Sequence, residues 1–376
     1  MSKLVKNKWI WIIAAGALVL AAAVVFACMY LRGGEEELAA ITIDEEHFPD
    51  RFFRMFVSIN YDTDEDGVLS GDERRKVKEC LVSGRKIEDL TGIEFFPKLR
   101  ELDCSLNKLK VLDTSQNTDL RELDCSNNSI IGLDVSQNDK LQELNCSNNA
   151  MAFALDVSHN TKLQVLKCEN CSLVRLDVSK NRALLTLCCG YNELKSLDLR
   201  NNTKLTMLDI ENNHVTSLDL SRCKMLDTIY ASASGLSELD VSGCPRLVYL
   251  SCRNTGLTSL NAGGCENLVI LDCGGNELTD LDVTGCSRMT TLDCYDNKLV
   301  LLDVGGCNLL NSLNCSSNEL VSLNVTGCSG LVYLNCSSNY LTSLDVRTCP
   351  GIYRIWYDNN PMSEKDILGY PSSSFN

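Results

Sequence analysis

The stretch Leu120-Arg-Glu-Leu-Asp-Cys-Ser-Asn-Asn-Ser-Ile130 recurs with small changes down most of this chain of 376 residues. Apolar residues occupy its positions 1, 4, 6 and 11, and the alternation across Leu123 and Cys125 is typical of a short strand that points alternate side chains inward. Successive first positions are 21 residues apart, except for one extra residue between Leu141 and Leu163. These first positions are Leu99, Leu120, Leu141, Leu163, Leu184, Leu205, Leu226, Leu247, Leu268, Met289, Leu310, Leu331 and Ile352. A fixed period over this many copies predicts a solenoid in which each copy contacts only its neighbours.

The spacing L-x-x-L-x-C-x-x-N-x-L matches the leucine-rich-repeat signature, and the period falls within the range of that family. We therefore expect a leucine-rich-repeat solenoid with a parallel β-sheet on its concave face. The second half of each repeat is too short for a helix of about ten residues, so we expect few or no helices on the convex side. Position 9 is usually an asparagine such as Asn128, whose buried amide should bond to backbone groups of adjoining turns. Cys171, Ser234 and Thr255 replace it.

The amino-terminal segment predicts export. Lys3, Lys6 and Lys8 precede an uncharged run, residues 9–31, which as a helix would span a bilayer core of about 30 Å. The basic flank predicts that the repeats lie outside the cytoplasm. We therefore expect a single-pass cell-membrane protein. Cleavage after Ala27, giving a secreted protein, and lipidation of Cys28 remain alternatives, and all three interpretations agree on export.

The pattern divides the chain into seven parts. We expect a cytoplasmic tail (1–8), a transmembrane signal anchor (9–31), a linker (32–44), an EF-hand-like helical cap (45–82), an incomplete capping repeat (83–98), twelve leucine-rich repeats (99–351) and a C-terminal cap (352–376). The net charge is −15 and the cations are scattered, so we expect no nucleic-acid partner.

Most of the 21 cysteines stand at two positions of the repeat. Position 6 holds Cys104, Cys125, Cys146, Cys168, Cys189, Cys252, Cys273, Cys294, Cys315 and Cys336, and position 19 holds Cys223, Cys244, Cys265, Cys286, Cys307, Cys328 and Cys349. Parallel side chains on strands about 4.8 Å apart are poorly placed for disulfides, so we expect reduced core thiols. Cys168 and Cys171 stand at positions 6 and 9 of one repeat, so their spacing follows from the repeat and does not indicate a metal site. Cys188 falls at an outward position, so we expect it to be exposed and reactive, with Cys80 as a second candidate.

A calcium-loop pattern precedes the repeats, at residues 62–73. Asp62, Asp64 and Asp66 would supply carboxylates, Gly67 the sharp bend, Val68 a carbonyl, Ser70 a direct or water-mediated ligand, and Glu73 a bidentate carboxylate. We expect a helix on either side: one from Pro49-Asp50 carrying Phe52, Phe53, Phe56 and Val57, and one carrying Val77, Cys80 and Leu81. Because the chain holds one such loop, we expect one structural calcium ion rather than a calcium switch. An acidic surface turn is the alternative.

The helical, EF-hand-like cap followed by 21-residue repeats with cysteine at position 6 resembles the internalins of Gram-positive bacteria, and most of all their cysteine-ladder branch. The resemblance covers about residues 45–376. It implies display on the cell surface, no enzymatic activity and a partner on the concave face.

The outward positions 2, 3, 5, 7 and 8 would face such a partner. They are charged in the first repeats, as at Arg100, Glu101 and Asp103. Later they hold the ring side chains Tyr191, Tyr230, Tyr249, Tyr295, Tyr333, Tyr353 and Trp356. Aromatic side chains anchor protein or sugar ligands with little loss of entropy, so we expect a protein or glycan partner there. The alternative is that tyrosine simply favours strands.

Two other functional classes remain open. One is a structural spacer of the cell envelope without a specific ligand. The other is a glycosidase built on concave carboxylates, which regular acidic ladders do not favour. The three histidines, His47, His159 and His214, lie in different regions, so no nucleophile–histidine set can be placed and we expect no enzyme.

Overall fold

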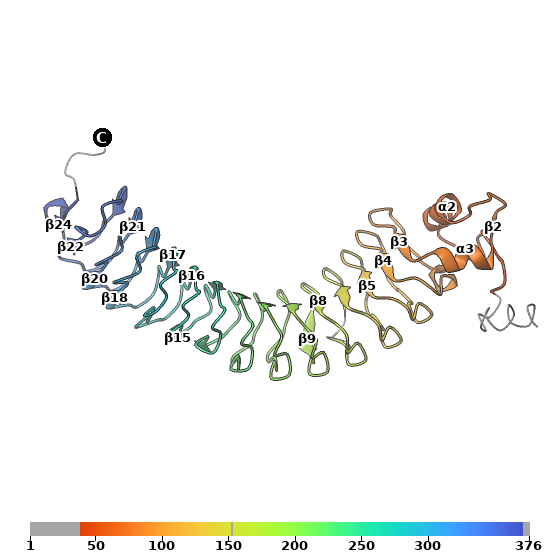
Figure 1. Cartoon of the computed structure of the whole chain (residues 1–376), viewed down its shortest axis with the longest axis horizontal. Coiled ribbons are helices and arrows are strands. Elements are labelled where there is room, and N and C mark those ends of the chain that lie inside the picture. Colours follow the sequence, from red (N-terminus) through yellow and green to blue (C-terminus); the bar gives the residue numbers. More distant parts are fainter. Residues whose placement is uncertain (1–37, 152, 371–376) are drawn as a thin grey trace, which may run out of the picture.

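The described residues form one long, curved solenoid, seen from the side in Figure 1 as an arc with its main sheet on the inner, concave side. This computed structural model describes residues 38–151 and 153–370. A 14-stranded sheet of parallel strands lines the concave side. Its strands, in spatial order, are β3 (Glu79–Leu81), β4 (Glu101–Asp103), β5 (Glu122–Asp124), β6 (Glu143–Asn145), β8 (Val165–Lys167), β10 (Thr186–Cys188), β11 (Met207–Asp209), β12 (Thr228–Tyr230), β14 (Tyr249–Ser251), β16 (Ile270–Asp272), β17 (Thr291–Asp293), β19 (Ser312–Asn314), β21 (Tyr333–Asn335) and β23 (Arg354–Trp356). The predicted leucine-rich-repeat solenoid is confirmed.

Every strand pairs with its neighbour at equal repeat positions. Leu102 lies opposite Leu123, and Leu123 lies opposite Leu144, so the position-4 leucines form one buried column. Each buried leucine contributes about 1.5–3 kcal/mol of hydrophobic free energy. The core is therefore continuous from end to end, while contacts join only adjacent repeats.

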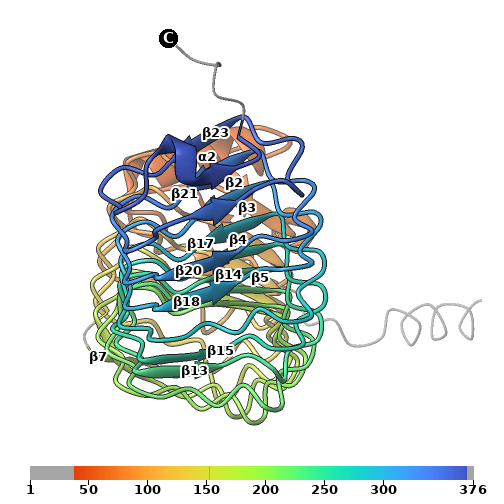
Figure 2. The same ribbon diagram turned by 90° about the vertical axis from the view of Figure 1, so that its left-hand side faces the viewer.

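The convex side holds short two-stranded pairs instead of helices, and Figure 2 shows them stacked along the array. The pairs are β7 (Phe153–Leu155) with β9 (Leu173–Leu176), β13 (Glu238–Asp240) with β15 (Ser259–Asn261), β18 (Leu301–Asp303) with β20 (Ser322–Asn324), and β22 (Leu344–Asp345) with β24 (Ile367–Leu368). In the described part of the repeats, helical geometry is limited to the single 3-10 turns η1 (Ile93–Phe95) and η2 (Glu364–Asp366). The expectation of few or no convex helices is confirmed.

The position-9 asparagines bond as the sequence predicted. The Asn128 side-chain nitrogen donates to the carbonyls of Cys104 and Cys125, each at 3.0 Å, and its oxygen accepts from the Leu109 N–H at 2.9 Å. Of the replacements, the Cys171 thiol still donates to the Cys146 carbonyl and the Thr255 hydroxyl to the Cys252 carbonyl. This position therefore ties a turn to the one before it in most repeats, while the buried Ser234 hydroxyl has no partner among the described residues.

A small cap precedes the first strand. Helix α2 (Arg51–Asn60) begins at Asp50, whose carboxylate accepts hydrogen bonds from the Phe52 and Phe53 N–H groups. The helix buries Phe53 and Val57, and strand β1 (Ile41–Thr42) pairs antiparallel with β2 (Val68–Leu69) beyond it. Helix α3 (Gly71–Lys76) follows.

The second predicted helix is wrong in its extent. Helix α3 ends at Lys76, Val77 turns into extended geometry, and Cys80 lies opposite Leu102 as part of β3. The reason is that Cys80 fills the inward position of a first solenoid strand, where its side chain is fully buried. Pairing with β4 therefore overrides the helical pattern of this segment.

The predicted membrane location is wrong for the part of the chain that the structure describes. Within residues 38–151 and 153–370, no helix is long and apolar enough to cross a bilayer. The segment predicted to do so, residues 9–31, lies outside the described residues.

Candidate binding surface on the concave face

Repeat positions 3 and 5 face outward from the concave sheet, on either side of the buried position 4. In β12, for example, Ile229 is fully buried while Thr228 and Tyr230 are half-buried. Because adjacent strands pair in register, side chains at equal positions form columns along the array. We call them the position-3 column and the position-5 column.

The position-3 column begins with four glutamates. Glu79, Glu101, Glu122 and Glu143 lie opposite one another on consecutive strands. Partial burial and the neighbouring Glu122 raise the pKa of Glu101 above its usual value. Like charges placed directly opposite are destabilising, so the amino-terminal part of the concave face is strongly acidic at a cost in stability.

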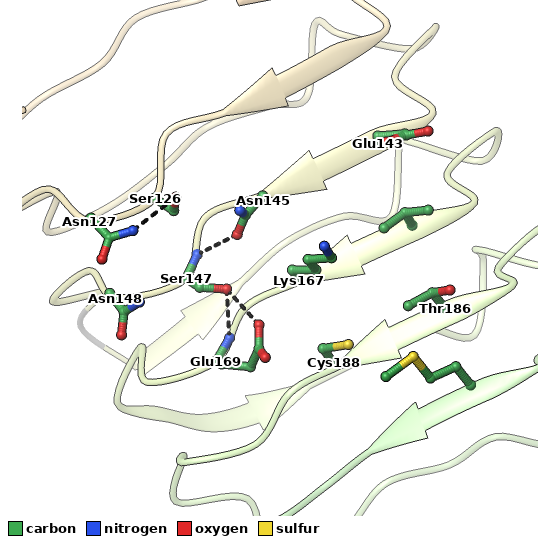
Figure 3. A pocket seen from close by; sticks show the side chains of 12 residues that line it. Ser126, Asn127, Glu143, Asn145, Ser147, Asn148, Lys167, Glu169, Thr186 and Cys188 are labelled. Carbon is green, nitrogen blue, oxygen red and sulfur yellow. Dashed lines mark hydrogen bonds between the residues drawn. The ribbon is translucent and has the colours of Figure 1, made fainter. Parts of the chain in front are cut away.

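A shallow hollow of about 630 Å³ follows, lined by strands β6 to β11 and drawn in Figure 3. The Ser147 hydroxyl donates to the Glu169 carboxylate at 2.8 Å at one side, and Lys167 and Cys188 lie along its middle. Lys167 is exposed. The hollow thus combines one cation with carboxylates, amides and hydroxyls.

The prediction of an exposed, reactive Cys188 is wrong. Cys188 points toward the hollow, but it is only 4% exposed, and burial raises its pKa to about 12. Cys80 is fully buried, and burial likewise raises its pKa to about 12. Since the thiolate is the reactive form, both side chains are inert at neutral pH. Every cysteine that the structure describes is a buried free thiol, as the ladder argument predicted.

The ring side chains selected from the sequence separate into two pairs and three other rings. Tyr230 and Tyr249 lie 5.0 Å apart between ring centroids at 42°, and Tyr333 and Tyr353 lie 6.1 Å apart at 77°. Beside the second pair, the Arg354 guanidinium lies 4.7 Å from the centroid of the Trp356 ring.

Tyr191 and Tyr295 stand apart from these pairs. Tyr191 is 56% exposed at position 8, where the backbone is left-handed with a φ of 56°. The Tyr295 ring lies across Gly274, because a Cβ placed on that glycine would meet the ring at 2.2 Å. The structure therefore does not join the seven residues into one site.

Charged residues that the sequence reading missed adjoin the first pair. The Arg253 Nε lies 3.2 Å from one oxygen of Asp272, and Asp272 lies opposite Asp293 in the position-5 column. Asp293 accepts a hydrogen bond of 3.0 Å from the Asn314 side chain. Burial raises the pKa of both aspartates. Aspartates at position 5 of consecutive repeats were the signal that could have pointed to this cluster.

Three of the predicted calcium ligands lie together in the loop between α2 and α3. Carboxylate oxygens of Asp62, Asp64 and Asp66 all lie within 4.8 Å of one another. Asp62 accepts hydrogen bonds from the Asp66 and Gly67 N–H groups, and Gly67 has a left-handed φ of 79°. Partial desolvation and the neighbouring Asp66 raise the pKa of Asp64.

Glu73 is held away from these three carboxylates. One of its oxygens accepts from the Thr63 N–H and hydroxyl at 2.7 and 2.6 Å, and the other accepts from the Ser70 N–H and hydroxyl at 2.9 and 2.8 Å. Although burial alone would raise it, these four bonds lower the pKa of Glu73 to about 2. The three aspartates fit a calcium ion, while Glu73 and Ser70 would have to exchange hydrogen bonds for the metal.

No protein-family model and no curated protein matches the sequence. Among solved structures, the functional domain of InlJ from Listeria monocytogenes, which includes a cysteine ladder, gives a TM-score of 0.70 at 28% identity over 88% of this chain and 74% of that one. InlF, an internalin from the same species, gives 0.68 at 20% identity over 89% and 99%. The ectodomain of the Arabidopsis thaliana receptor kinase GASSHO1/SCHENGEN3, in complex with CASPARIAN STRIP INTEGRITY FACTOR 2, gives 0.59 at 18% identity over 72% and 37%.

The fold and the in-register columns of its concave face define a leucine-rich-repeat protein. Within that class, the buried cysteine ladder and the likeness to InlJ and InlF make it an internalin-like bacterial protein.

Proposed function

We propose that this protein works by binding, with a partner seated on its concave face in an adhesion or recognition role, and that it is not an enzyme. The observation that carries the proposal is the pair of half-buried rings, Tyr230 and Tyr249, at solvent-facing strand positions. The fold does not require rings there, because Ser251 and Ser312 occupy equivalent positions elsewhere.

Two further facts support this proposal. Paired tyrosines offer a large rigid surface with few rotatable bonds, which is why such residues dominate binding energies. The plant receptor ectodomain of the same fold was solved in complex with CASPARIAN STRIP INTEGRITY FACTOR 2. A structural spacer and a glycosidase remain alternatives without a specific observation in their favour.

The experiment compares concave and control variants of the full chain. A partner is first isolated by pull-down from cell surfaces, and its affinity is then measured for Tyr249→Ser and Tyr333→Ser. Tyr249 belongs to the first tyrosine pair and Tyr333 to the second. We expect the substitution in the pair that the partner contacts to weaken binding by at least about tenfold, as for a hot-spot residue. Tyr340→Ser is the matched control, because Tyr340 is 60% exposed but lies outside both columns.

Greater loss of binding on Asp240→Ala, Asp282→Ala or Asp303→Ala would assign the partner to the convex side and contradict the proposal. Unchanged binding in all tyrosine variants would favour a spacer.

We also propose one structural calcium ion held by Asp62, Asp64, Asp66, the Val68 carbonyl, Ser70 and Glu73. Three carboxylates within 4.8 Å repel one another unless a cation joins them, and Gly67 provides the bend such a loop needs. The bound ion would supply charge neutralisation, and strand β1 would be held against β2 more firmly.

Limited proteolysis of the full chain tests the calcium proposal. We expect calcium to protect the cap, and Asp62→Ala or Glu73→Ala to remove that protection. Asp72→Ala is the matched control, since Asp72 lies next to the site in the first turn of α3 and its carboxylate pairs with Arg75. Equal cleavage of the unsubstituted protein in calcium and in chelator would refute the site.

A further inference from the structure

We propose that the concave surface formed by Tyr230, Tyr249, Arg253, Asp272 and Asp293 is a binding site for a neutral oligosaccharide. The inference rests on the proposed concave-face function and names the chemical class of its ligand.

Four of the five side chains come from one continuous part of the sheet, strands β12, β14, β16 and β17, and Arg253 lies two residues after β14. Tyr230, Ser251, Asp272 and Asp293 follow one another in the position-5 column, in register. Strands in a sheet lie about 4.8 Å apart, so this run measures roughly 14 Å. Tyr249 stands beside it in the position-3 column and packs against Tyr230. The site is therefore elongated along the array, with rings at one end and carboxylates at the other.

The ring end offers a stacking surface. The planes of the Tyr230 and Tyr249 rings meet at 42°, and both side chains are half-buried. Each ring therefore keeps part of its surface exposed to solvent. The carbon-bound hydrogens of a sugar ring form an apolar face that packs against aromatic rings, while the hydroxyls at its rim seek polar partners.

The carboxylate end holds one under-satisfied acceptor. One Asp272 oxygen pairs with Arg253, but its other oxygen is buried and has no protein partner among the described residues. An under-satisfied acceptor of this kind costs free energy. Because that oxygen is buried, a ligand hydroxyl would instead donate to the other oxygen of Asp272, beside the Arg253 guanidinium.

The architecture of the repeat does not require these acids. Position 5 also accommodates Asn145, Lys167 and Ser251. Placing Asp272 directly opposite Asp293 adds like-charge repulsion. Aspartates at position 5 of other repeats accept a hydrogen bond from the position-7 N–H, as Asp124 does from Ser126 at 2.9 Å, so the feature particular to Asp272 and Asp293 is the pair of rings beside them.

The mixture of charges selects a neutral ligand. A lysine or arginine of a bound peptide would approach the carboxylates but would meet the Arg253 guanidinium, and an acidic side chain would meet Asp272 and Asp293. Sugar hydroxyls suit both, because each can donate to a carboxylate and accept from a guanidinium. The glutamates at the amino-terminal end of the face have no rings in their column and lack this combination.

Calorimetric titration of the full chain tests the proposal. The probes are five neutral hexasaccharides: cellohexaose, laminarihexaose, maltohexaose, mannohexaose and hexa-N-acetylchitohexaose. We expect at least one to bind, with a loss of at least about tenfold in affinity on Tyr249→Ser and on Asp272→Asn. Asp272→Asn keeps the shape of the side chain, so a loss of binding with an unchanged melting temperature reports on recognition rather than folding.

The matched controls are Tyr340→Ser and Asp240→Asn, which should leave sugar affinity unchanged. Two other repeats already hold asparagine at the position of Asp240, namely Asn261 and Asn324, so the repeat accommodates the Asp240→Asn change. Absence of binding to all five sugars, or binding that Tyr249→Ser and Asp272→Asn do not weaken, overturns the proposal. If a protein partner is captured and lost on Tyr249→Ser while no sugar binds, the concave-face function stands and the sugar assignment fails.

Discussion

At the scale of single residues, position 19 shows how cysteine can take the place of asparagine in the later repeats of this solenoid. Asn117, Asn160, Asn181 and Asn202 each donate twice to carbonyls of earlier turns, but each leaves its amide oxygen buried without a partner among the described residues. Later repeats use cysteine, whose thiol donates to the same kind of carbonyl, as from Cys328 to Val304 at 3.1 Å. Cysteine carries no oxygen to satisfy, so the replacement removes the unpaired acceptor.

Asn138 is the informative exception, because the Thr114 hydroxyl donates to its oxygen at 2.9 Å. We predict that Thr114→Val removes this donor and lowers stability by about 1–3 kcal/mol, although valine is the residue of this position in neighbouring repeats. Conversely, Val157→Thr should supply a donor to Asn181 and should not destabilise. Urea midpoints of the two variants check this pair of predictions, and equal losses in both would contradict it.

Asp209 gives a second prediction at this scale. Burial, aided by Glu211 and Glu169, raises its pKa to about 6. Because the folded-state pKa lies above the unfolded value, the favourable contribution is complete below about pH 4 and is lost as the pH rises through about 6. At pH 7, Asp209→Asn should therefore stabilise the protein, by no more than about 1 kcal/mol after solvent screening. Melting temperatures at pH 4 and pH 7 test it: the gain should vanish at the lower pH.

At the scale of elements, the strands and the helix-free convex side could be predicted because each follows from local periodicity. The position-9 asparagine and the cysteine ladder were predictable for the same reason. The end of α3 was not, because Cys80 and Leu81 fit a helical face as well as a strand, and only pairing with β4 decides between them.

The site was predictable in part. Outward positions could be assigned from the repeat, which located the tyrosines, but the pairing of Tyr230 with Tyr249 depends on side-chain rotamers. The burial of Cys188 depends on its place between Lys167 and Asp209, its partners on the two flanking strands. Neither property is encoded in the repeat pattern.

Strand β1 carries an element-scale prediction. A Cβ on Gly71 would lie 2.6 Å from the Leu38 carbonyl oxygen, so Gly71→Ala should push the adjoining residues 38–43 off the loop. The Ile43 N–H, which donates to the Gly67 carbonyl at 3.0 Å, should then exchange with solvent faster. Gly132→Ala is the control, because nothing lies within 4 Å of its added Cβ. Hydrogen exchange followed by mass spectrometry measures the effect, and unchanged protection of Ile43 in Gly71→Ala would contradict it.

At the scale of the whole molecule, the stability of the solenoid is a sum of repeats and their interfaces, and each end repeat has one neighbour fewer. Local opening should therefore be commonest at the ends and rarest in the middle. The cysteine ladders provide a reporter in almost every repeat, since a thiol reacts only when its turn opens and it can ionise.

We predict that timed alkylation of the native protein labels Cys349, in the last repeat, well before the ladder cysteines of the central repeats. Cys188 should behave like those central neighbours because it is only 4% exposed and its pKa is raised to about 12. Alkylation in denaturant without reductant should label all the described cysteines, since none is paired. Mass spectrometry of peptides follows each site. Two outcomes would contradict the prediction. Rapid native labelling of Cys188 would show that the concave face opens independently of the ends. Labelling of all ladder cysteines at one rate would show that the solenoid unfolds as a single cooperative unit.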